Sequence, residues 1–137
     1  MFKQANAFRR LTMATGIYIA CFALHNADHA RRGVQASPEP VMWAGTAVAM
    51  LSATLVTLVV VRHRLAPICC AVGGTAIATG VMLSHLLPKW GVLSDPVLVG
   101  GIDGWTRVAV MSEIMGAAVL AAAGWRSLNL TSNTKPQ

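Results

Sequence analysis

The chain has 137 residues, of which 55% are hydrophobic and only 12% are charged, and its mean hydropathy is +0.57. A soluble globular domain carries about a quarter charged residues, so this composition excludes that class and indicates an integral membrane protein. The formal net charge of +6 does not predict nucleic-acid binding, because membrane topology accounts for the distribution of the basic residues.

Four apolar windows are long enough to cross a hydrocarbon core, which takes about 20 helical residues. None of them alternates strictly between polar and apolar residues, so the sequence predicts an all-α bundle of four transmembrane helices rather than a β-barrel. The predicted spans are Leu11–Ala30, Val41–Val61, Leu65–Leu87 and Thr106–Trp125. A signal peptide is the alternative interpretation of the first span, and the other three would remain in that case.

These spans form one domain, residues 11–126, between two polar ends. Residues 1–10 are predicted to be a basic N-terminal segment, and residues 127–137 a polar, disordered tail. In the loop after the third span, a short apolar stretch, Val97–Val99, is flanked by turn residues. It either lies on the membrane surface or folds back over the bundle.

The charged residues predict that both termini are cytoplasmic. With this orientation seven basic residues lie on the cytoplasmic side and four on the outer side, in agreement with the positive-inside rule. All five acidic residues lie on or toward the outer side. Tryptophans anchor helix ends at membrane interfaces, and Trp43, Trp90 and Trp105 mark the outer boundary while Trp125 marks the inner one.

The stretch LHNADHARRG, residues 24–33, places a polar stripe at the outer end of the first helix. Helical residues three, four, seven or eight positions apart share one face, and Asn26 and Arg31 diverge from that face. The residues that share it are Cys21, His25, Asp28, His29 and Arg32.

The third and fourth helices bring further ionisable residues to the same side. His85 lies one turn before Pro88, at a depth similar to that of His25 for a rise of about 1.5 Å per residue. Asp103 and Arg107 are spaced to form an ion pair at the start of the fourth helix. Glu113 lies about 10 Å deeper, and a charge inside a membrane indicates a functional site.

This cluster predicts a metal site. The HxxxH spacing of His25 and His29 presents two imidazoles on one helix face, and Asp28 adds a carboxylate beside them. His85 or Glu113 would complete the coordination from another helix. Such a ligand set suits zinc, iron or copper about equally.

Three alternatives to a metal site are compatible with the sequence. His25 and His85 could be the axial ligands of a b-type haem between two helices. The polar cluster could instead bind an anionic headgroup or a quinone, or relay protons, with the charged groups at the helix ends as its contacts. Those charged residues are Arg31, Arg32, Asp103 and Arg107. Finally, the cluster could only cap helices and contact water at the interface.

Two outer motifs, HNADHARRG (residues 25–33) and HLLPKWGVLSDP (residues 85–96), resemble those of a group of small four-span membrane proteins of actinobacteria without an established activity. The resemblance covers the four-helix outline and these two motifs. It implies a location in a bacterial plasma membrane and carries over no catalytic residue.

The sequence therefore predicts a small multi-pass membrane protein that binds a metal ion or a small ligand at its outer face. The alternative is an accessory subunit that assembles with a larger membrane complex, or with copies of itself, through its small-residue helix faces. An enzyme is a third class, with Glu113 or a histidine as a general base. The sequence does not favour it, because no nucleophile, phosphate loop or established catalytic motif is present.

Overall fold

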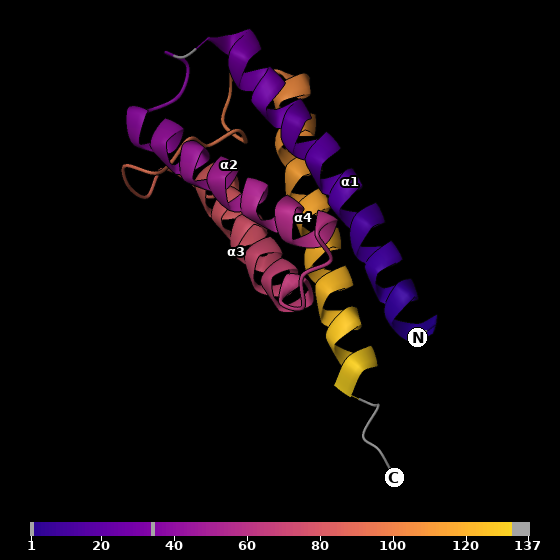
Figure 1. Ribbon diagram of the computed structural model, residues 1–137. Coiled ribbons are helices and arrows are strands. Elements are labelled where there is room, and N and C mark those ends of the chain that lie inside the picture. Colours follow the sequence, from indigo (N-terminus) through magenta and orange to yellow (C-terminus); the bar gives the residue numbers. More distant parts are fainter. Residues whose placement is uncertain (1, 34, 133–137) are drawn as a thin grey trace.

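Four long α-helices make up most of the chain, as the sequence predicted (Figure 1). The computed structural model describes the backbone of residues 2–33 and 35–132 and the side chains of residues 6–33 and 35–129. The helices run alternately up and down, so both chain ends lie at the same end of the bundle. The helices are α1 (Phe2–Arg32), α2 (Glu39–Val60), α3 (Ala66–Leu86) and α4 (Gly104–Ser132).

Two predicted boundaries differ from the structure. Residues 1–10 are predicted to precede the first helix, but α1 begins at Phe2, because no glycine or proline interrupts this segment. The tail predicted from residue 127 is helical as far as Ser132. The rest of that predicted tail, residues 133–137, lies outside the described residues.

Proline and glycine lie at three of the helix ends. Pro40 and Pro67 lie in the first turns of α2 and α3, where a missing N–H breaks no helical hydrogen bond. Gly33 follows α1 with a φ of +88°, and its N–H donates to the carbonyl of His29 over 3.0 Å. This left-handed cap ends α1 directly after the stripe.

We call the end of the bundle with the chain termini the terminal end, and the opposite end, with His25, His29 and His85, the histidine end. Toward the terminal end, α3 and α4 touch through their backbones. A Cβ atom on Gly124 would lie 2.4 Å from the backbone nitrogen of Ala71. Small residues permit such an approach between membrane helices, so this contact fixes where α3 and α4 cross.

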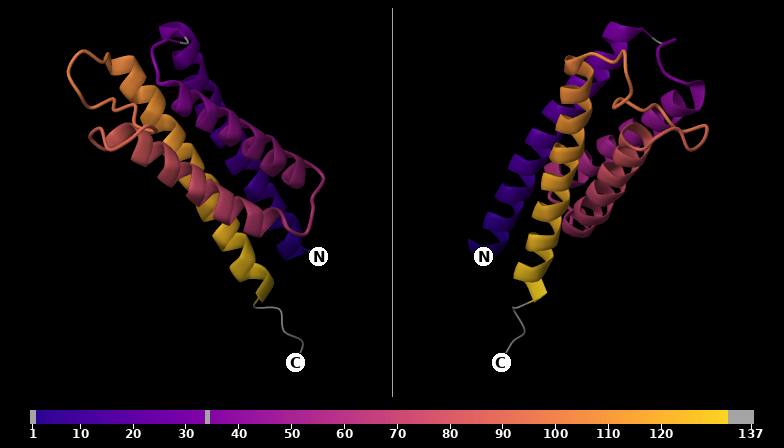
Figure 2. Two further views of the ribbon diagram at one scale, coloured as in Figure 1. Left: turned by 90° about the vertical axis from the view of Figure 1, so that its left-hand side faces the viewer. Right: turned by 180° about the vertical axis from the view of Figure 1, so that it is seen from behind.

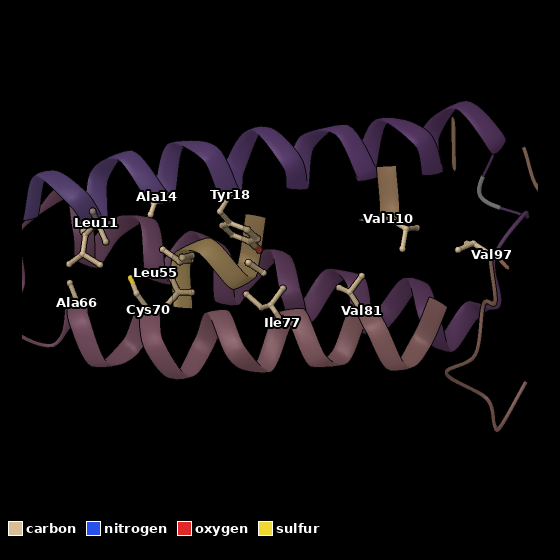
Figure 3. Close-up of a cluster of buried hydrophobic side chains, with 13 residues drawn as sticks. Leu11, Ala14, Tyr18, Leu55, Ala66, Cys70, Ile77, Val81, Val97 and Val110 are labelled. Carbon is tan, nitrogen blue, oxygen red and sulfur yellow. The ribbon is translucent and has the colours of Figure 1, made fainter. Parts of the chain in front are cut away.

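A buried apolar core runs along the bundle between α1 and α3 (Figure 3). Leu11, Leu55 and Ile77 point into it from three different helices, and each is at most 2% exposed. The side chain of Tyr18 on α1 also lies in this core, and its hydroxyl hydrogen-bonds to Oγ of Ser52 on α2. This bond ties α2 to α1 near the middle of the bundle.

The outside of the bundle is strongly apolar. All four helices are long and apolar enough to cross a membrane, over Asn6–Arg32, Glu39–Val60, Ala66–Leu86 and Gly104–Asn129. Large side chains such as Met13, Met50 and Val60 are more than 60% exposed. Exposed apolar surface of this extent is typical of contact with lipid, in agreement with an integral membrane protein.

Candidate metal site

Three imidazoles meet at the histidine end. His25 and His29 lie four residues apart on α1 and so share one face, and His85 reaches them from the last turn of α3. The ring centroid of His25 lies 4.7 Å from that of His29 and 5.1 Å from that of His85. One nitrogen from each ring lies within 4.8 Å of the other two. The two sequence motifs that carry these histidines are therefore brought together in space.

The Nδ1 atoms of His25 and His85 are held by acceptors within the chain. Nδ1 of His25 hydrogen-bonds to Oε2 of Glu113 on α4, and Nδ1 of His85 donates to the backbone carbonyl of Asp95 over 2.8 Å. The backbone carbonyl of Asp95 only accepts hydrogen bonds, so Nδ1 of His85 carries a proton, and we assign the same tautomer to His25. On both rings Nε2 is then left with the lone pair.

Nε2 of His25 is the most informative atom of the cluster. The His25 side chain is only 6% exposed, and Nε2 has no hydrogen-bond partner within the described part of the chain. A buried polar atom without a partner costs about 1–3 kcal/mol. The third ring, His29, has its Nδ1 atom 3.3 Å from Oγ of Ser37 and 3.3 Å from Nη2 of Arg32. A guanidinium only donates, so Nδ1 of His29 accepts in the contact with Arg32.

Asp28 is the centre of an ion-pair network beside the imidazoles. Its side chain is fully buried, and Oδ1 accepts hydrogen bonds from Arg31 over 2.7 Å and from Thr106 over 3.2 Å. Oδ2 accepts a hydrogen bond from Arg32 over 3.0 Å. Both oxygens are thus occupied by donors of the chain. The predicted role of Asp28 as a metal ligand is replaced in this structure by ion pairing.

The two arginines of the first motif pair with carboxylates of other elements as well. Arg31 donates to Oδ2 of Asp103 over 2.7 Å, and Nη2 of Arg32 lies 3.8 Å from Oδ2 of Asp95. Helical spacing predicts that Arg31 diverges from the stripe, but its long side chain turns back and joins the network. The guanidinium groups predicted to bind an anionic headgroup therefore already have carboxylate partners.

Asp103 caps the start of α4. Its Oδ1 accepts a hydrogen bond from the backbone N–H of Thr106 over 2.8 Å. That bond, followed by the hydrogen bond from Arg31, lowers the pKa of Asp103 to about 2, from its usual 3.8. Within the described residues Arg107 donates instead to the carbonyl of Val97 over 3.2 Å. The predicted Asp103–Arg107 ion pair is therefore wrong.

The loop of residues 87–103 folds back over the imidazoles. The N–H of Val97 donates to the carbonyl of His85 over 2.9 Å, and the Val97 side chain is 1% exposed. Of the two predicted positions for the apolar stretch, the structure has the one over the bundle. The carboxylate of Asp95 also accepts a hydrogen bond from Ser37 over 2.7 Å, which joins this loop to the loop after α1.

Asp95 and Ser37 are site residues that sequence reasoning missed. Both lie in loops, next to Pro96 and Pro38, where residues follow no helical period. The only sequence signal is that a short polar residue before proline favours a turn. Such a signal locates a turn in the chain, but it does not indicate which helix the turn contacts.

Glu113 was predicted as a metal ligand from the fourth helix. The structure places it in the bundle interior at 2% exposed, with Oε2 bonded to Nδ1 of His25. A carboxylate in this position fixes the orientation of the ring and raises the basicity of its other nitrogen. Glu113 is therefore linked to the three imidazoles by its hydrogen bond to His25.

A cavity of about 230 Å³ lies beside the three imidazoles, between α1, α2, α3 and the loop of residues 87–103. Most of the residues that line it are apolar, among them Phe22, Val41, Val48 and Val81. The ionisable residues in its wall are the three histidines and Glu113. The cluster thus faces an apolar space that is large enough for a small organic group.

Two further predictions can be placed in the structure. The rings of His25 and His85 touch edge to face, which leaves no space for a porphyrin plane between them, so this geometry does not fit the haem alternative. Cys21 packs against α4, where a Cβ atom on Gly116 would lie 2.9 Å from it. Cys21 does not belong to the group of described residues that lie close enough together to bind one metal ion.

Comparison of the chain with protein-family models, with curated proteins and with solved structures finds no match. The residues of the site and their geometry are therefore the basis on which a function is assigned.

Proposed function

We propose that the histidine end binds one transition-metal ion through the imidazoles of His25, His29 and His85, with Nε2 as the ligand atom of His25 and of His85. The observation that carries the proposal is the buried Nε2 of His25, which has no partner in the described chain and lies beside two further imidazoles. Three imidazoles without a shared ligand would leave at least one buried lone pair unsatisfied. A metal ion bound by all three would satisfy it.

The hydrogen bonds at Nδ1 support this proposal. Histidines that bind metals nearly always donate their other ring N–H to a carboxylate, a carbonyl or water. Here Glu113 and the carbonyl of Asp95 are the acceptors for His25 and His85. Both bonds orient Nε2 without competing for it.

The ligand set favours a particular group of metals. Neutral imidazoles suit zinc, copper and iron, whereas magnesium and calcium prefer oxygen ligands. Three protein ligands with an open fourth position are typical of catalytic zinc sites. We therefore expect a tetrahedral ion whose fourth position faces the cavity.

The proposal places this site on the extracytoplasmic side of a bacterial plasma membrane. The seven-to-four distribution of basic residues supports this orientation. Cysteines introduced at the exposed positions Gln35 and Arg64 test it in a variant without native cysteines. An impermeant reagent added to intact cells should label position 35 and not position 64.

Metal content per chain, measured by elemental mass spectrometry on protein purified in mild detergent, tests the binding itself. The wild type should hold about one metal ion, and His25→Ala, His29→Ala and His85→Ala should each lower the metal affinity at least 10-fold. His63→Ala is the matched control, because His63 is exposed in the turn between α2 and α3.

Circular dichroism and gel filtration of each variant separate loss of metal from loss of fold. A wild type that binds zinc, copper and iron no better than the triple histidine variant would contradict the proposal. In that case co-purification of a partner protein would favour the accessory-subunit interpretation.

A further inference from the structure

We infer that the cavity binds the alkyl chain of a neutral, lipid-soluble ligand whose single donor atom, an oxygen or a nitrogen, lies at the three imidazoles. For the donor atom the inference rests on the proposed metal site, because the open coordination position would bind that atom. For the alkyl chain it rests on the cavity alone. The two parts can therefore be tested separately.

The walls of the cavity are mostly apolar and so favour an apolar chain over a polar one. Beyond the imidazoles and Glu113, the polar side chains in the wall are Asn26 and Ser84, and both donate to backbone carbonyls of the chain. One donor group of each is therefore already occupied within the chain. A chain bound here would contact mainly valine, leucine and aromatic side chains, and it would gain stability by leaving water.

Two glycines leave space in this wall. Gly45 on α2 and Gly80 on α3 both line the cavity, and a Cβ atom on either would meet no other atom within 4 Å. Packing does not require glycine at these positions, in contrast to Gly124. Larger residues would fit the helices but would reduce the space beside the imidazoles.

The charges around the cavity favour a neutral ligand. Among the described residues no lysine or arginine lines it, since Arg31 and Arg32 are paired with carboxylates outside its wall. Glu113 does line it, and a carboxylate there would offset part of the charge of a bound divalent ion. A phosphate or a fatty-acid anion therefore has no cationic side chain to bind.

The position of the cavity allows entry from the bilayer. Its wall includes Val41, Gly45 and Val48 of α2 and Gly80 and Val81 of α3, and all of these lie within candidate spans. The α2–α3 hairpin leans away from α1 and α4 at the histidine end (Figure 2). Gly45 and Gly80 are exposed, so a lipid-soluble molecule would meet this face directly.

Cobalt-loaded protein in mild detergent provides the first test, because the visible spectrum of Co²⁺ changes when its open position is filled. The probes are 1-methylimidazole and 1-butylimidazole, which share the donor atom and differ by three methylene groups. We expect the butyl probe to bind about 50-fold more tightly to the wild type. In Gly45→Phe the preference should fall below about 5-fold, while the methyl probe still binds.

The matched control is Gly16→Phe, at an exposed position of α1 where a Cβ atom also meets nothing within 4 Å. It should retain the full preference for the butyl probe at the same detergent concentration. Equal binding of the two probes to the wild type, or an unchanged preference in Gly45→Phe, would overturn the inference while the metal site stands.

A metal-free test addresses the chain alone. Trp90 lines the cavity, and replacement of Trp43, Trp105 and Trp125 by phenylalanine leaves it as the only tryptophan. Its fluorescence should be quenched saturably by 6-bromo-1-hexanol, and the additional change Gly45→Phe should abolish the saturable component. If this happens but cobalt does not bind, the proposed metal site is wrong and the alkyl site is upheld. Quenching that does not saturate would overturn the alkyl site.

Discussion

The terminal half and the histidine half of the bundle are built in opposite ways. Toward the termini, α3 and α4 touch through Gly124 and Ala71, and the core beside them is largely apolar. At the histidine end, buried polar side chains such as Asp28 and Glu113 lie between helices that leave a cavity of about 230 Å³. The terminal half thus joins α3 to α4 through a glycine contact, with an apolar cavity of about 440 Å³ between α2 and α3 beside it, whereas the histidine half buries ionisable groups beside its cavity.

This difference teaches how a very small membrane protein can hold buried charge. Burial of ionisable groups in a membrane is costly unless they are paired, and pairing requires fixed helix positions. The close contacts of the terminal half supply those positions. The polar half then needs only a few ion pairs and hydrogen bonds, centred on Asp28 and His25.

The largest expected effect concerns the contact between α3 and α4 in the terminal half. Gly124→Val would place side-chain atoms on the backbone of Ala71, whose nitrogen would be 2.4 Å from the new Cβ atom. We expect a loss on the order of 4 kcal/mol or more in the free energy of unfolding, measured by denaturant titration in detergent. Gly16→Val, with nothing within 4 Å of its Cβ atom, should be nearly neutral. Similar stability of the two variants would show that the glycine contact does not set the packing.

The next largest effect concerns the ion pairs of Asp28 in the histidine half. Asp28→Ala would leave Arg32, whose side chain is only 12% exposed, without its i,i+4 partner and would remove a hydrogen-bond acceptor of Arg31. We expect a loss of about 3 kcal/mol in the free energy of unfolding. Glu39→Ala removes an exposed carboxylate at the start of α2 and serves as the control. If both variants lose equally little, the network does not stabilise the histidine end.

A smaller effect concerns the attachment of α2 between the two halves. Tyr18→Phe removes the hydrogen bond to Ser52 and leaves the aromatic ring in the core. We expect a loss of about 1 kcal/mol, and Ser52→Ala should have the same effect. In a double-mutant cycle the two losses should not add. Additive losses would mean that the two residues act independently.

The smallest expected effect is on the stability of the protein at acid pH. Because the folded pKa of Asp103 is about 2 and its usual value is 3.8, its contribution to stability is present above about pH 4. It is lost as the pH falls toward about 2. Asp103→Asn should therefore reduce the loss of stability between about pH 5 and about pH 2.5. Glu39→Gln is the charge-matched control, and an equal acid response in wild type and Asp103→Asn would contradict the assignment.

The four helices and the meeting of the histidines could be predicted from the sequence. Apolar length identifies the spans, and helical spacing places His25, His29 and Asp28 on one face. The position of Pro88 sets His85 one turn from the end of its helix. These features depend on the helical repeat and on the number of residues along a helix, and both can be read directly from the sequence.

The cavity and the partners of the charges could not be predicted. The cavity is lined by residues of four helices and a loop that are far apart in sequence, so it depends on how these elements pack together. The positions of Asp95 and Ser37 depend on loop conformation. The choice of Arg31 over Arg107 as the partner of Asp103 depends on which helices are neighbours.

The central claim is that the imidazoles of His25, His29 and His85 share one metal ion. X-ray absorption at the edge of the bound metal, on zinc-loaded wild type and on His63→Ala, tests it most directly. The account predicts about three imidazole nitrogens at about 2.0 Å, with one further light atom in the first shell. A shell of oxygens without imidazole scattering, or a sulfur at about 2.3 Å, would contradict it.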